Sequence, residues 1–66
     1  MPTMNYKPPY PQPGETWKDW TEEAFEVVCI AYSCEDGVDV VVYKAGRQHY
    51  TRHLATWFDA MRRVDR

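Results

Sequence analysis

The sequence has few glycines and cysteines, and it contains no long hydrophobic run. Its three glycines are far apart, which excludes a glycine-rich loop of the kind that holds phosphate groups. No apolar stretch approaches the roughly 20 residues that a membrane-spanning helix needs, and the first residues lack the basic and apolar regions of a secretion signal. These absences predict a soluble protein of the cytoplasm that has no membrane partner.

The two cysteines, Cys29 and Cys34, are too few for a disulfide framework. They are five positions apart, so on a regular strand their side chains point to opposite faces, and we expect free thiols. With His49 and His53 they come close to the spacing of a two-cysteine, two-histidine zinc site. A zinc finger needs both thiolates on a short knuckle, whereas this segment is predicted to be mostly strand. We therefore predict no metal and no cofactor, and keep zinc binding as a minor hypothesis.

The composition is that of one small folded domain. Hydrophobic residues make up 44% of the 66 residues and aromatic residues 15%, which is too much for a disordered chain. A domain of this size buries only about 60% of the surface that its unfolded chain exposes. Its stability margin is therefore thin, and we expect a homo-oligomer.

Charge is divided unevenly along the chain, although the net charge is only −2. Residues 1–40 hold two lysines and eight acidic residues, whereas residues 41–66 hold six basic residues and two aspartates. The acidic excess and the lack of a dense basic stripe argue against nucleic acid as a partner.

All five prolines lie within the first 13 residues, which excludes a helix or a central strand there. We predict a Pro-rich extended arm over residues 1–14, followed by one domain over residues 15–66. Pro8 and Pro11 beside Lys7 have the spacing that polyproline-binding domains accept. The arm can therefore recognise a partner or lie on its own domain.

A β-hairpin is the centre of the predicted fold. Residues 25–32 and 38–43 are rich in β-branched and apolar residues, and they flank Asp36 and Gly37, a dipeptide typical of hairpin turns. Residues 25–32 also fit an amphipathic helix capped by Thr21. We prefer the strand, because a turn and a second valine-rich run of matching length follow directly.

Three further elements complete the prediction. Residues 16–20 indicate a short edge strand, and residues 47–52 a third hairpin strand after a turn at residues 44–46. Apolar residues at three- and four-residue spacing predict a C-terminal helix over residues 54–64 that covers the sheet. Its apolar stripe, interpreted as core, consists of Leu54, Trp57, Phe58, Met61 and Val64.

No catalytic constellation is present, so we predict that the protein is not an enzyme. His49 and His53 have no nucleophile or carboxylate at a spacing that indicates a proton relay. Aromatic faces and arginine forks suit a small anionic, nucleotide-like ligand. The predicted ligand-binding residues are Trp17, Trp20, Tyr43, Arg47, Tyr50 and Arg52.

Several short segments resemble a family of small bacterial and phage proteins known as a domain of unknown function. The resemblance covers about residues 14–61 and is carried by Phe25-Glu26-Val27-Val28, Val41-Val42-Tyr43, Tyr50-Thr51-Arg52, Leu54 and Trp57-Phe58. It implies a small SH3-like antiparallel β-barrel, mainly β with a C-terminal helix, and a non-enzymatic module common in phage genomes. By analogy, such a protein acts in the host cytoplasm.

Two functions follow from these observations. In the first, the protein sequesters a small anionic ligand or host nucleotide signal between aromatic and arginine side chains. In the second, it is an adaptor or inhibitor that acts on a host protein through the Pro-rich arm or an aromatic patch.

Overall fold

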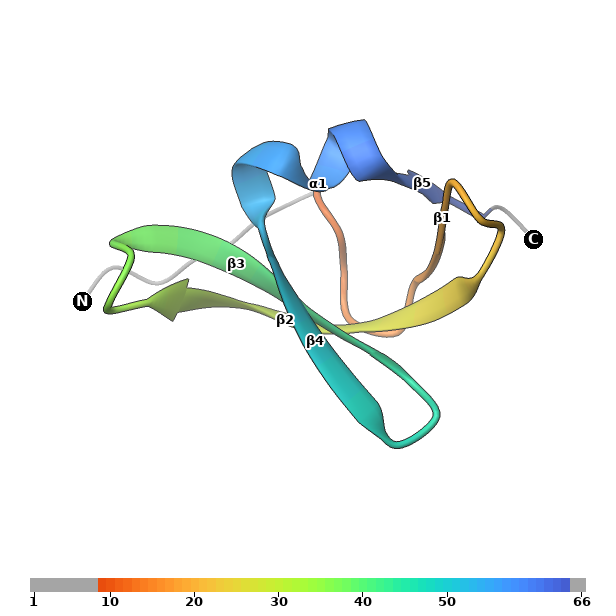
Figure 1. Cartoon of the computed structure of the whole chain (residues 1–66), viewed down its shortest axis with the longest axis horizontal. Helices are drawn as coiled ribbons and strands as arrows, with labels where there is room; N and C mark the ends of the chain where they lie inside the picture. The colour runs from red at the N-terminus through yellow and green to blue at the C-terminus, as the bar shows by residue number, and fades with distance from the viewer. Residues whose placement is uncertain (1–8, 65–66) are drawn as a thin grey trace.

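The computed structural model describes residues 9–64, which form one antiparallel sheet of five strands and one short helix (Figure 1). The strand order is β4-β3-β2-β1-β5, so β4 and β5 are the two edges of an open sheet. The helix connects these edges and lies over one face of the sheet, which we call the inner face (Figure 1). The elements are β1 (Thr16–Asp19), β2 (Ala24–Ser33), β3 (Val38–Ala45), β4 (Gln48–His53), α1 (Leu54–Ala60) and β5 (Met61–Arg63).

The predicted central hairpin is confirmed, and the helical alternative for residues 25–32 is wrong. Strands β2 and β3 pair from Glu26 opposite Lys44 to Ser33 opposite Val38. In the loop between them Gly37 has φ 69°, which glycine adopts without a steric penalty, and its amide donates to the Ser33 carbonyl at 2.7 Å.

The second hairpin joins β3 to β4 through a two-residue loop. Ala45 pairs with Gln48, and Gly46 occupies the first loop position with φ 60°, as a type II′ turn requires. The predicted third strand is therefore confirmed, displaced by one residue to Gln48–His53.

Two predictions about the other side of the sheet were wrong. The first strand is not an edge, because β1 lies between β2 and β5. The C-terminal helix does not extend over residues 54–64; it ends at Ala60, and β5 pairs antiparallel with β1 so that Trp17 lies opposite Arg63. The physical reason is that β1 needs hydrogen-bond partners on its second side, which an extended segment supplies and a helix cannot.

The core lies between α1 and the inner face of the sheet. Trp57 of α1 is completely buried. Its ring centroid lies 5.4 Å from that of Trp17 and 5.0 Å from that of Tyr43, and both ring pairs are edge to face. Leu54 and Ala60 of the helix pack against the same cluster. The buried members are Trp17, Phe25, Val27, Val41, Tyr43, Trp57 and Met61.

The described end of the predicted arm is attached to the domain. Pro11 is completely buried, and the Gly14 amide donates to the Val27 carbonyl at 2.9 Å. The residues before Pro9, including Pro8 of the proline pattern, lie outside the described residues. Within residues 9–64 no helix has the length and apolar character needed to cross a bilayer.

Candidate functional site

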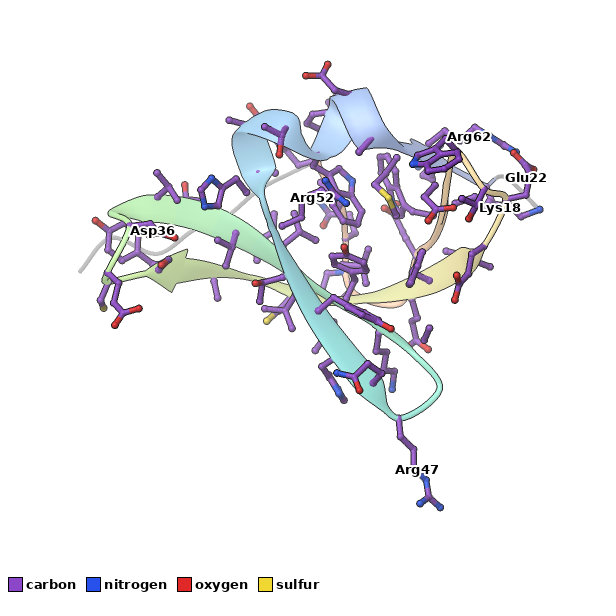
Figure 2. All side chains as sticks on the ribbon, viewed as in Figure 1. Lys18, Glu22, Asp36, Arg47, Arg52 and Arg62 are labelled. Carbon is purple, nitrogen blue, oxygen red and sulfur yellow. The ribbon has the colours of Figure 1, made fainter. Side chains whose placement is uncertain are left out.

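The six predicted ligand-binding residues do not form one site. Trp17 and Tyr43 are only 4% and 6% exposed and belong to the core. Trp20, in contrast, is 85% exposed in the turn after β1. Figure 2 shows Arg47 projecting from the tip of the β3–β4 hairpin, away from the rest of the molecule. The fold therefore separates the predicted aromatic and basic groups.

Tyr50 and Arg52 remain together, because they are two positions apart on β4 and therefore on the same face. The Tyr50 ring stacks on Tyr43 with centroids 5.5 Å apart and is 39% exposed. Arg52 lies opposite Val41, and its Nε is buried without a hydrogen-bond partner among the described residues. Tyr50 and Arg52 are therefore the part of the predicted anion-binding site that lies on one face of the sheet.

The zinc candidates are also dispersed. Cys29 pairs with Val42 within the sheet, whereas Cys34 lies exposed in the β2–β3 loop, and both are free thiols. His49 and His53 are at opposite ends of β4. Residues 9–64 contain no group of three or more histidine, cysteine or acidic side chains arranged to hold a metal ion.

A groove that the sequence did not predict lies between the β2–β3 hairpin, α1 and the segment before β1. It has a volume of about 510 Å³. Three aromatic side chains in its walls are partly exposed, with exposed fractions of 39% for Tyr10, 47% for Tyr32 and 44% for Phe58. We call this the aromatic groove; its lining residues are Tyr10, Tyr32, Gly37, Val38, Asp39, Leu54, Ala55 and Phe58.

A β-bulge places Tyr32 in this groove. The β2–β3 register shifts between Val27 and Cys29, so one extra residue, Val28, interrupts the alternation of faces. Before the bulge the odd-numbered Val27 points to the core, and after it the even-numbered Tyr32 is on the same side. Tyr32 pairs with Asp39 of β3, and both line the groove. If the same residues formed a regular strand with no bulge, the Tyr32 ring would point to the opposite face.

Phe58 forms the wall on the helix side. It follows the buried Trp57, so it lies at the margin of the helix face that packs on the core. Its ring centroid lies 5.9 Å from that of Tyr10 and 6.0 Å from that of Trp17, and both ring pairs are edge to face. The helical spacing predicted Phe58 as core, but α1 is only seven residues long and the Phe58 side chain is not fully covered.

Glu15 fixes the segment that carries Tyr10. Its Oε1 accepts hydrogen bonds from the Gln12 amide at 2.9 Å and the Trp17 indole at 3.0 Å, and its Oε2 accepts one from Arg63 at 3.2 Å. The Gln12 side chain also donates to the Tyr10 carbonyl at 3.0 Å. Partial burial raises the pKa of Glu15, but these three donors outweigh that effect and hold the pKa below its ordinary value of 4.5.

A smaller hollow of about 300 Å³ adjoins Phe58 on its other side and includes Trp20. It is bordered by a charged cluster in which Arg62 of β5 donates to Glu22, as Figure 2 shows. The Arg62 hydrogen bond and charge lower the pKa of Glu22. The Thr21 hydroxyl, at 2.6 Å, does the same for Asp19. Charges therefore stabilise this turn, whereas the aromatic groove is almost uncharged.

The residues that sequence reasoning missed are Tyr10, Tyr32 and Phe58. The sequence analysis placed Tyr10 in the arm, Tyr32 in a strand and Phe58 in the apolar stripe of the helix. The only sequence signal that could have linked them is that all three are aromatic side chains adjacent to a turn or an element end.

Comparison with known proteins gives no assignment: no protein-family model, no curated protein and no solved structure matches this chain. The resemblance to the small bacterial and phage family therefore stays a prediction.

Proposed function

We propose that the protein is a non-catalytic binding module that captures an extended segment of another protein in the aromatic groove, and so acts as an adaptor or inhibitor. The observation that carries this proposal is the exposure of three aromatic rings, Tyr10, Tyr32 and Phe58, around one groove. Aromatic side chains half-buried at a surface are the usual anchors of protein interfaces, because they bury much apolar area at little cost in conformational entropy.

The charge of the groove favours a protein segment over a small anion. Among the described lining residues Asp39 is the one charged side chain, and no lysine or arginine lines the groove. A phosphate or carboxylate ligand would therefore meet an acid and no cation. A largely apolar segment of a protein suits these walls better than an anion does.

The test is a selection of linear peptides from a display library on the immobilised full chain, followed by affinity measurements on one selected peptide. We expect Tyr32→Ser and Phe58→Ser to weaken binding at least about tenfold, which is the loss of about 1.4 kcal/mol that an aromatic anchor supplies. Trp20→Ser is the matched control, because Trp20 is 85% exposed but lies outside the aromatic groove. Failure to enrich any peptide, or an equal loss with Trp20→Ser, would contradict the proposal.

A second candidate function is binding of a small anionic ligand at Tyr50 and Arg52. The specific observation in its favour is the buried Arg52 Nε that lacks a partner within residues 9–64, beside a partly exposed tyrosine ring. A ligand present at a hundredfold excess over its dissociation constant stabilises the native state by about 2.7 kcal/mol. A screen of nucleotides should therefore raise the melting temperature of the natural chain but not of Arg52→Gln, and no shift with any nucleotide removes this candidate.

The proposed architecture is a small SH3-like barrel, as the resemblance implies. It is supported by the strand order β4-β3-β2-β1-β5 and by the short helix that connects the two edge strands. An experimental structure in which β4 and β5 diverge, with no helix between them, would be against it.

A further inference from the structure

Strand β4 has a regular backbone edge that no other strand of the described sheet covers. It lies at one end of the strand order and pairs with β3 alone, without a register shift. Within residues 9–64, none of the backbone hydrogen bonds made outside the regular elements involves a β4 residue. An edge of this kind carries N–H and C=O groups that can pair with a further strand.

The two edges of the sheet differ in the features that normally prevent such pairing. Proteins protect an edge by a very short strand, a proline, a bulge or charged side chains. Strand β5 is three residues long, and two of these residues are arginines. Strand β4 is six residues long and has no proline, no lysine and no bulge, and Arg52 is its one arginine. Of the two edges in the described sheet, β4 is therefore the one suited to pairing.

The register of the β3–β4 hairpin shows which backbone groups of β4 face away from the sheet. Ala45 and Gln48 enclose the two-residue turn, so they form a hydrogen-bonded pair, and such pairs alternate along an antiparallel ladder. The even-numbered residues of β4 therefore bond to β3, and the odd-numbered residues direct their N–H and C=O groups outward. The outward-directed residues are His49, Thr51 and His53.

Antiparallel pairing of β4 with a second copy of itself satisfies these outward groups. A twofold axis at Thr51 places the two threonines opposite each other, so that each amide donates to the carbonyl of the other. The same register places His53 of the second copy opposite His49, where its amide can donate to the His49 carbonyl. Outward-directed residues thus meet outward-directed residues on both sides of the axis.

The side chains are compatible in this register as well. Threonines that lie opposite each other stabilise an antiparallel pair. Tyr50, whose ring is partly exposed, lies opposite Arg52 of the second copy, and an arginine packs favourably on an aromatic face. Arg47 lies opposite Ala55, so no two arginines face each other directly. A register centred on Arg52 would instead place two guanidinium groups opposite each other.

We propose that the protein forms a homodimer in which β4 pairs antiparallel with β4 of a second copy about Thr51, so that two five-stranded sheets become one sheet of ten strands. No β4 residue lines the aromatic groove, so the dimer keeps both grooves accessible along β4 and does not rest on the proposed function.

Sedimentation equilibrium of the full chain and two variants tests the dimer. One edge pairing buries a small area, so we expect a dissociation constant on the order of 1 μM to 1 mM. Thr51→Lys places two lysines opposite each other at the axis. Thr16→Lys is the matched control, because Thr16 is also exposed on a strand, but β1 is paired on both sides. We expect Thr51→Lys to raise the dissociation constant at least about fivefold and the control to leave it unchanged.

Amide hydrogen exchange of the natural chain adds a measurement that needs no substitution. The Thr51 amide should be protected at high protein concentration and exchange on dilution, in parallel with the fraction of dimer. The Tyr50 amide, which bonds to β3, should stay protected at both concentrations. A monomer at all concentrations, an equal effect of the two variants on the dimer, or Thr51 protection that does not follow the dimer fraction would overturn the proposal.

Discussion

Trp57 is completely buried and also carries an unsatisfied polar atom. The effect of its substitution on the free energy of unfolding can therefore be predicted quantitatively. Its side chain has no exposed surface, and its ring contacts Trp17 and Tyr43 in the centre of the core. Its Nε1 has no hydrogen-bond partner among residues 9–64. The apolar ring therefore stabilises the fold, while the buried N–H destabilises it by about 1–3 kcal/mol.

Two substitutions separate these contributions. Trp57→Ala removes the ring and leaves a cavity, which costs about 3–5 kcal/mol. A chain of 66 residues has a total stability of about 3–10 kcal/mol. We therefore expect Trp57→Ala to be mostly or entirely unfolded at the temperature at which the natural protein is folded.

Trp57→Phe keeps an edge-on ring but removes the N–H. The two ring carbons that are lost cost about 1.6 kcal/mol at about 0.8 kcal/mol each. Relief of the unsatisfied N–H offsets most of this, so we expect a change of less than about 1 kcal/mol in the free energy of unfolding. Urea denaturation followed by circular dichroism measures both variants. A loss above about 3 kcal/mol for Trp57→Phe would refute the reasoning, because Nε1 would then have a partner outside the described residues.

Three further predictions concern the groove and its supports. Because the folded pKa of Glu15 is depressed, its contribution to the free energy of unfolding is present above pH 4.5 and is lost as the pH falls through the folded pKa. The melting-temperature difference between the natural chain and Glu15→Gln should therefore vanish in acid. A difference that persists there would contradict this prediction. Gly37→Ala should destabilise the folded protein by about 1 kcal/mol because of the positive φ alone. The added Cβ would meet only the Tyr32 hydroxyl, at an ordinary van der Waals distance of 3.7 Å. An unchanged urea midpoint of unfolding would be inconsistent with that φ. Deletion of Val28 should remove the bulge and leave Tyr32 opposite Asp39 on the groove side, so a selected peptide should still bind, and loss of binding with the β-sheet dichroism retained would argue against this register.

The central hairpin was predictable because its signals are local. Valine-rich runs of equal length on either side of Asp36 and Gly37 need no knowledge of distant residues. The end of the chain was not predictable in the same way. Met61 is buried whether it continues a helix or begins a strand, so its apolar character cannot distinguish them. What decides between them is the pairing of β5 with β1, more than 40 positions away in the sequence, together with the ion pairs from Arg62 to Glu22 and from Arg63 to Glu15.

The candidate site could not be predicted because two structural features that form it have no signal in the sequence. One is the bulge at Val28, because a single extra residue in a strand changes which face Tyr32 occupies without changing the composition. The other is the short length of α1, which leaves Phe58 partly exposed although its spacing is that of a core residue. Conversely, Trp17 and Tyr43 were interpreted as ligand contacts, but a small domain needs its largest side chains in the core.

The central proposal is that the aromatic groove binds an extended apolar segment of another protein, and proton NOE spectra of the full chain test it most directly. We expect cross-peaks from the rings of Tyr32 and Phe58 to a selected peptide when that peptide is added to the protein. Rings that show no cross-peak to the peptide at saturating peptide concentration would contradict it.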